Sequence, residues 1–201
     1  MLDQVRKKLQ HYGAEHQQPL IDEAMREAAV LIALTQSTTP SMVFIKRAEH
    51  VSSHKGQVAF PGGMWEPQDA SLLETALRES EEEIALPRSE VEVVASLRPR
   101  KTRFAVRVSP FVGFIPENIA FIPEEAELDS VFTVPLQHLL TPENYGRAHF
   151  DTHVGEYEAP CIFFEEYRIW GFTFGILMDV LDEVFDFKAP IKREFTFKSN
   201  D

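Results

Sequence analysis

Three glutamates that lie close together, Glu79, Glu82 and Glu83, have the residue type and spacing that could do chemistry. On a helix, residues three and four positions apart share a face, so these carboxylates would converge on one side. Carboxylates held so close repel one another and are best tolerated when divalent cations lie between them. Hard oxygen ligands of this kind suit Mg²⁺ or Mn²⁺. The spacing therefore predicts a metal site formed by Glu79, Glu82 and Glu83.

The residues before these glutamates favour a binding site over the alternative, a solvated acidic helix face, which is the more common origin of such a run. Gly62 and Gly63 let the backbone turn sharply and approach a ligand closely, and Pro61 stiffens the chain before them. A strand, a Gly-Gly turn and an acid-lined helix form an arrangement suited to metal and phosphate.

The helix that carries the glutamates is expected to bury its other side. The residues on that side recur at the spacing of a core-facing stripe: Leu73, Ala76, Leu77, Ser80 and Ile84. Arg78 lies four residues before Glu82, so we expect it to orient the carboxylates.

This stretch resembles the Nudix box, G-x5-E-x7-R-E-U-x-E-E-x-G-U, in which U is a bulky apolar residue. Gly63 matches the opening glycine, Arg78-Glu79 and Glu82-Glu83 match the two charged pairs, and Leu86 matches the last apolar position. The metal-binding half of the motif is intact. The sequence departs from the box in the loop and at the helix end: Asp69 replaces the first glutamate, eight residues separate it from Arg78, Ser80 occupies an apolar position and Ala85 replaces the final glycine.

The segment before the box resembles the signature of the coenzyme A pyrophosphatase subgroup of Nudix hydrolases, L-L-T-x-R-[SA]-x3-R-x3-G-x3-F-P-G-G. Arg47, Ala48, Gly56 and residues 60–63 match it, whereas Ser52 stands where the signature has arginine. An arginine there would be a natural phosphate or adenine partner. The cations that could replace it are Lys46, Arg47, His54 and Lys55.

A basic stretch follows the box in a chain whose net charge is −12. A cluster of like charges repels itself unless it meets anions, so we expect it to bind substrate phosphates. The alternative is that these cations balance nearby acids. The cluster consists of Arg98, Arg100, Lys101, Arg103 and Arg107. The predicted substrate-binding residues are Arg47, Gly62, Gly63, Arg98, Arg100, Lys101 and Arg103.

The resemblance also implies a glutamate on a loop after the box that completes the metal site or acts as general base. Glu125 and Glu127 are the candidates by position. The catalytic set is therefore Glu79, Glu82, Arg78, Glu125 and Glu127, and the sequence does not choose between Glu82, Glu125 and Glu127 as the base.

Composition narrows the class of protein. The chain has 201 residues and 44% hydrophobic content, enough for one domain with appendages. Its acidity argues against binding to nucleic acid or to a membrane surface. The single Cys161 lies in an apolar run and is expected to be buried. Without an apolar signal core or membrane-length run, we expect a cytoplasmic protein with a small nucleotide substrate; a homodimer is left open.

Hydrophobic periodicity predicts a mixed α/β chain in which strands outnumber helices. Helices are expected at 2–12, 20–28, 136–140 and 172–185, strands at 29–35, 41–47, 90–97 and 109–116, a turn at 36–40 and a loose hairpin over 143–170. The resemblance implies a Nudix-type α/β/α sandwich with a mixed central sheet. It divides the chain into an N-terminal helical extension (1–27), a Nudix hydrolase domain (28–187) and a C-terminal tail (188–201).

The resemblance implies metal-dependent hydrolysis of a pyrophosphate bond, with coenzyme A giving 3′,5′-ADP and 4′-phosphopantetheine. Two alternatives are a Nudix pyrophosphatase for another substrate, such as ADP-ribose or NADH, and a binding module that has lost catalysis.

Overall fold

The computed structural model describes residues 2–9, 12–13, 18–19, 25–51, 54–152, 155–194 and 196–197. The chain forms two compact units, Met1–Pro135 and Leu136–Asp201. In the described part of the chain, every helix is too short or too polar to cross a membrane.

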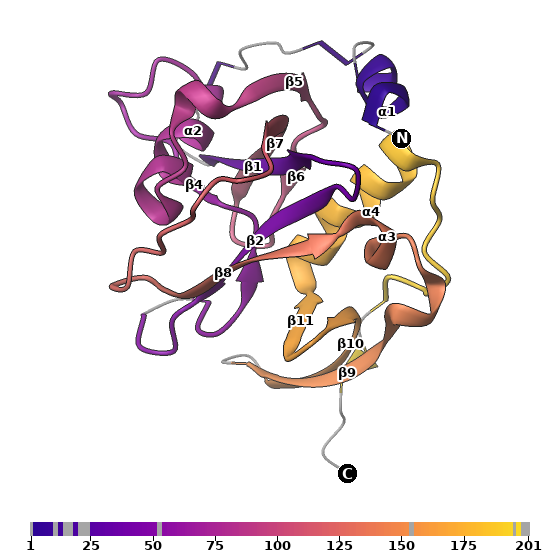
Figure 1. Cartoon of the computed structure of the whole chain (residues 1–201). Helices are drawn as coiled ribbons and strands as arrows, with labels where there is room; N and C mark the ends of the chain where they lie inside the picture. Colours follow the sequence, from indigo (N-terminus) through magenta and orange to yellow (C-terminus); the bar gives the residue numbers. More distant parts are fainter. Residues whose placement is uncertain are drawn as a thin grey trace. The chain divides into compact units, whose positions relative to one another are not determined.

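The first unit is built around a mixed eight-stranded sheet (Figure 1). Its strands are β1 (Arg26–Gln36), β2 (Ser41–Arg47), β3 (Val58–Ala59), β4 (Gly62–Met64), β5 (Glu92–Ser96), β6 (Arg100–Lys101), β7 (Val106–Pro116) and β8 (Leu128–Pro135). The order is β3-β2-β1-β7-β5, with β4 beside β1, β6 beside β7 and β8 beside β2. β1 and β7 are parallel from Arg26 opposite Val106 to Gln36 opposite Pro116, whereas the other pairs are antiparallel. The predicted mixed α/β class is therefore confirmed.

Helix α2 (Leu72–Ile84) packs its apolar face on this sheet. Ser71 caps its N-terminus by accepting a hydrogen bond from the Glu74 N–H at 3.2 Å. The predicted core stripe is confirmed, since all five of its residues are buried. The helix ends at Ala85, whose φ of 53° is left-handed. The Nudix box has glycine at this position, and glycine is the residue that adopts this conformation without steric cost.

Most of the elements predicted for the first unit are confirmed. Helix α1 (Leu2–Leu9) lies within the predicted 2–12 helix, and β1 and β2 form the expected hairpin. The strand expected at 90–97 is β5, preceded by the short helix η1 (Arg88–Glu90). The helix predicted at 20–28 is wrong for residues 26–28, which pair with β7 at the start of β1. Residues 20–24 lie outside the described part of the chain.

The second unit contains a small antiparallel sheet and a helix. Its elements are α3 (Leu136–Leu139), η2 (Pro142–Asn144), β9 (Tyr145–Thr152), β10 (Gly155–Phe164), β11 (Tyr167–Trp170), α4 (Gly171–Phe185) and β12 (Thr196–Phe197). β9, β11 and β12 all pair with β10, so the expected hairpin is extended to more strands. The predicted short helix, the predicted long helix and the burial of Cys161 are confirmed. Burial raises the pKa of the Cys161 thiol to about 11, so this thiol stays protonated.

Candidate active site

Gly62 and Gly63 bring the backbone of β4 against the carboxylates of α2. Gly62 has a φ of 144°, and a Cβ there would lie 2.6 Å from the Cα of Val30. Its N–H donates to Oε2 of Glu83 at 2.9 Å. A Cβ on Gly63 would lie 2.6 Å from Oε2 of Glu79. Only glycine fits at Gly62, and the backbone at Gly63 touches the first box glutamate directly.

Arg78 connects the loop before α2 to two of the box glutamates. Its Nη2 lies 3.0 Å from Oε1 of Glu79, and its Nη1 lies 2.9 Å from Oε2 of Glu82. The same Nη2 donates to the Met64 carbonyl oxygen at 3.2 Å. The guanidinium therefore fixes the orientation of both carboxylates relative to β4.

Asp69 holds Arg78 from the opposite side. Burial alone would raise the pKa of Asp69, but hydrogen bonds from Arg78, the Glu66 N–H and Thr75 lower it below its usual value. The Thr75 hydroxyl donates to Oδ2 of Asp69 at 2.9 Å. In the sequence, Asp69 is only a substitution in the box. The signal for this contact is its position at an acidic site of the motif, ahead of Arg78.

Glu83 is the most deeply buried of the box glutamates, with 5% of its surface exposed. Burial raises its pKa to about 8, and the negative charges of Glu79 and Glu127 add to this effect. Burial also raises the pKa of Glu79, although Arg78 opposes the shift. These carboxylates resist ionisation together, which is the electrostatic condition that a bound cation relieves.

Glu127 reaches the box from the loop that follows β7. The loop is tied to the end of α2 by two backbone bonds, from the Ile122 N–H to the Ile84 oxygen at 3.1 Å and from the Glu124 N–H to the Glu83 oxygen at 2.9 Å. Arg47 links Glu127 to Glu83, with Nη2 3.6 Å from Oε2 of Glu127 and Nη1 3.7 Å from Oε1 of Glu83. After burial, which is the main cause, the charge of Glu127 adds to the raised pKa of both Glu79 and Glu83. Glu127 and the other candidate, Glu125, are both exposed in this loop.

The donors fit a divalent metal in kind, because all are carboxylate oxygens and they repel one another when ionised. In the described part of the chain, however, no three acidic, histidine or cysteine side chains converge in a geometry ready to hold an ion. Arg78 contacts Glu79 and Glu82, while the Gly62 N–H and Arg47 contact Glu83.

The NUDIX domain family model matches residues 25–154, more than half of the chain. The chain belongs to the Nudix family. It is 40% identical over 159 residues to the protein named "Uncharacterized Nudix hydrolase NudL" of Yersinia enterocolitica, covering 78% of this chain and 80% of that one. The NudL protein of Yersinia pestis is 37% identical over 159 residues, covering 79% and 80%. The chain is therefore an enzyme, a pyrophosphohydrolase, and the alternative of a binding module without catalysis is set aside.

Solved structures confirm the Nudix fold. A MutT/nudix family protein from Enterococcus faecalis aligns with a TM-score of 0.54 at 17% identity and covers 85% of this chain. The alignment spans 64% of that protein, slightly under two thirds of its length. At this identity the similarity concerns the fold alone.

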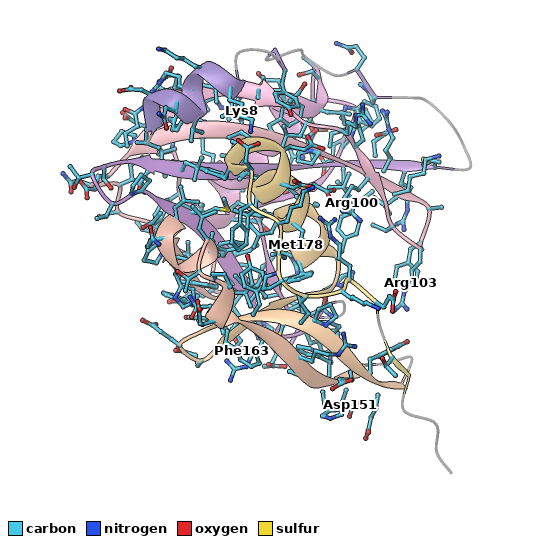
Figure 2. All side chains as sticks on the ribbon, turned by 90° about the vertical axis from the view of Figure 1, so that its right-hand side faces the viewer. Lys8, Arg100, Arg103, Asp151, Phe163 and Met178 are labelled. Carbon is cyan, nitrogen blue, oxygen red and sulfur yellow. The ribbon has the colours of Figure 1, made fainter. Side chains whose placement is uncertain are left out.

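The basic stretch of this Nudix enzyme divides into two groups. Arg107 is bound to the buried Glu27, with its Nε 2.8 Å from Oε1 and 2.9 Å from Oε2, so it is part of the packing between β1 and β7. Arg98, Lys101 and Arg103 are exposed, and Arg100 is half-buried. Figure 2 shows Arg100 and Arg103 extending from the β6–β7 hairpin.

The sheet register gives the separation between this hairpin and the box. Arg100 pairs with Val108, Val108 with Ala28 and Ala28 with Met64, so three strand spacings separate β6 from β4. At about 4.8 Å per spacing, the two backbones are about 14 Å apart. The hairpin therefore lies apart from β4 along the sheet.

The other cations predicted to replace the subgroup arginine have different surroundings. Ser52 itself lies outside the described residues. Lys46 is bound to Asp129 at 3.1 Å, His54 Nδ1 lies 2.9 Å from the Gln57 side-chain oxygen, and Lys55 is exposed. Among these cations, Arg47 forms ion pairs with two acids of the site, Glu83 at 3.7 Å and Glu127 at 3.6 Å.

Proposed function

We propose that this Nudix hydrolase splits the pyrophosphate bond of coenzyme A or an acyl-coenzyme A with the help of Mg²⁺ or Mn²⁺. The observation that carries the metal-dependent chemistry is the electrostatic coupling of Glu79, Glu83 and Glu127 beside the Gly62-Gly63 backbone. The raised pKa values of Glu79 and Glu83 mark an arrangement that is unfavourable in isolation and suitable around a divalent cation.

In this proposal Glu79 and Glu83 are the principal metal ligands, and Glu82 shares a second ion. The metal would neutralise the phosphoryl oxygens and acidify a water molecule. Arg78 keeps Glu79 and Glu82 oriented, and the two glycines let the β4 backbone approach the phosphate.

We propose Glu127 as the general base, because it is the loop glutamate whose charge contributes to the pKa shifts of Glu79 and Glu83. It accepts a proton from the attacking water as the water oxygen forms a bond to phosphorus. The bond from phosphorus to the bridging oxygen then breaks, and the second phosphate leaves with the electron pair.

The proposed substrate rests on two observations. The residues Arg47, Ala48, Gly56 and 60–63 resemble the coenzyme A signature. The backbone of β6, next to which the hairpin cations lie, is three strand spacings or about 14 Å from β4. This separation suits the 3′-phosphate, which coenzyme A carries in addition to its pyrophosphate. ADP-ribose and NADH are the alternative substrates for the same chemistry.

Product analysis tests the proposal directly. The protein is incubated with Mg²⁺ or Mn²⁺ and coenzyme A, acetyl-coenzyme A, NADH or ADP-ribose, and the products are separated by chromatography. We expect 3′,5′-ADP and 4′-phosphopantetheine from coenzyme A. Cleavage of NADH or ADP-ribose with coenzyme A left intact would show that the substrate is one of these and not coenzyme A. No turnover of any of them would count against the proposed class of pyrophosphate substrates.

We further propose that the enzyme works on this small nucleotide in the cytoplasm. Neither nucleic acid nor a membrane is an expected partner for a chain with a net charge of −12. Sedimentation of the purified protein would distinguish a monomer from a homodimer.

A further inference from the structure

Arg47 is held by its backbone at an irregular point of the sheet. It ends β2, and the pairing of β2 with β8 shifts register between Lys46 and Arg47. Its N–H donates to the Gln57 oxygen at 3.0 Å, and its own oxygen accepts from the Gly56 N–H at 3.1 Å. The extra residue is Asp129 of β8, which lies between the partners of Lys46 and Arg47, so the ladder is irregular beside Arg47.

The guanidinium of Arg47 lies within ion-pair distance of two carboxylates that come from different elements. Nη1 is 3.7 Å from Oε1 of Glu83, and Nη2 is 3.6 Å from Oε2 of Glu127. Both distances exceed a normal hydrogen bond. The buried Nε has no hydrogen-bond partner among the described residues. The guanidinium is therefore held by charge and has donor capacity that these carboxylates do not use.

We infer that Arg47 is an internal counter-ion that competes with the divalent metal for Glu83. The inference rests on the proposed function, because it takes Glu83 as a metal ligand. A guanidinium and a dication cannot both lie against the Glu83 carboxylate, since like charges repel. Metal binding therefore releases Arg47, and its nitrogen donors become available to a phosphate oxygen of the substrate.

Without metal, Arg47 also positions Glu127. The backbone bond from the Ala48 N–H to the Glu127 oxygen, 2.8 Å long, fixes the loop next to β2. The adjacent arginine then attracts the Glu127 carboxylate towards Glu83, against the repulsion between the two acids. The site is thereby kept assembled until the metal enters.

Calorimetric titration of the full chain with Mg²⁺ tests this competition. All variants are titrated in the same buffer at one pH, so that a difference in affinity comes from the substitution. Arg47→Met removes the charge at similar length and should tighten Mg²⁺ binding about fivefold, the change that corresponds to about 1 kcal/mol. Its melting temperature in EDTA should fall below that of the wild type, and the difference should shrink in saturating Mg²⁺.

Arg88→Met is the matched control. Arg88 also bridges two carboxylates of α2, Glu74 at 3.0 Å and Glu81 at 3.2 Å, but neither of these is a proposed metal ligand. It should leave Mg²⁺ affinity unchanged. Should Arg47→Met not fold, Arg47→Gln gives the same expected direction while keeping hydrogen-bond donors.

The outcomes separate the two proposals. Weaker or unchanged Mg²⁺ binding in the Arg47 variants overturns the counter-ion inference and leaves the metal site standing. A wild-type protein that does not bind Mg²⁺ overturns the metal site itself.

Discussion

Arg78 and Asp69 form a bidentate ion pair, with Nε 2.8 Å from Oδ1 and Nη2 3.0 Å from Oδ2. The Asp69 side chain is 3% exposed, so the pair is shielded from solvent on that side. Because the two hydrogen bonds fix the plane of the guanidinium, the remaining Arg78 donors point to Glu79 and Glu82 in a defined geometry. Asp69 is therefore a positioning residue for the box carboxylates.

Replacement of Asp69 should affect both folding and activity. Asp69→Asn keeps the shape but loses the charge and one acceptor, so Arg78 loses its bidentate partner. We expect a loss of about 3 kcal/mol in unfolding free energy, as for a broken buried pair, and a reduced kcat from misaligned glutamates. Urea unfolding and steady-state kinetics measure the two effects. A variant with wild-type stability and kcat would show that Arg78 keeps its orientation without the ion pair to Asp69.

The box glutamates should be essential for turnover. Glu79→Gln and Glu83→Gln should each reduce kcat at least about a hundredfold while the fold survives, as expected for loss of a metal ligand. Glu81→Gln is the control, because Glu81 faces away from the box and pairs with Arg88 at 3.2 Å. Assays of the three variants in Mg²⁺ compare them directly. Near-normal rates in both ligand variants would place the site elsewhere.

The two glycines should respond differently to substitution. Gly63→Val places a side chain against the mobile end of Glu79, so kcat should fall at least about tenfold with little change in melting temperature. Gly62→Ala meets the backbone of Val30 at a φ of 144° and should cost about 1–3 kcal/mol of stability. Thermal melts and kinetics on both variants check this contrast. Full activity of Gly63→Val would mean that Glu79 can move without consequence.

The box helix was predictable from the sequence because its information is local. The stripe from Leu73 to Ile84 and the contact of Arg78 with Glu82 follow from helical spacing alone. The resemblance gives Glu125 and Glu127 as candidates by position, but local spacing does not choose between them. The approach of Glu127 depends on backbone bonds between α2 and a loop that returns after three further strands. The pairing of Arg107 with Glu27 is also non-local. The helix predicted at 20–28 includes Glu27, whereas the sheet register places Glu27 opposite Arg107.

The raised pKa of Glu83 predicts a pH dependence of stability in the metal-free protein. In the unfolded chain this carboxyl ionises near 4.5, whereas in the fold it keeps its proton until about 8. The folded state therefore binds more protons between these values, and the contribution of Glu83 to unfolding free energy falls as pH rises through this window. Below 4.5 the contribution is fully present.

Urea unfolding in EDTA at several pH values measures this slope. Glu83→Gln should remove this pH-dependent contribution. The unfolding free energy of the variant should therefore rise relative to that of the wild type as pH rises from about 4.5 to about 8. Parallel curves for the two proteins would contradict a buried, protonated Glu83.

The hairpin cations should discriminate between coenzyme A and dephospho-coenzyme A, which lacks the 3′-phosphate. Charge-assisted contacts contribute about 1.5–3 kcal/mol each, so loss of one should raise KM about tenfold or more. Arg100→Ala and Arg103→Ala are therefore expected to raise KM much more for coenzyme A than for dephospho-coenzyme A. The separation of β6 from β4 by three strand spacings is the reason, because it keeps these side chains from the pyrophosphate.

Two arginines of the same unit provide controls for this experiment. Arg88→Ala removes a surface guanidinium away from the hairpin and should leave both KM values unchanged. Arg107→Ala leaves Glu27 buried without its partner, so it should lower stability by about 3–5 kcal/mol and not act selectively on one substrate. Equal losses on both substrates in the Arg100 and Arg103 variants would instead place the hairpin at the pyrophosphate. Unchanged KM values would make the hairpin a surface charge patch and favour ADP-ribose or NADH as the substrate.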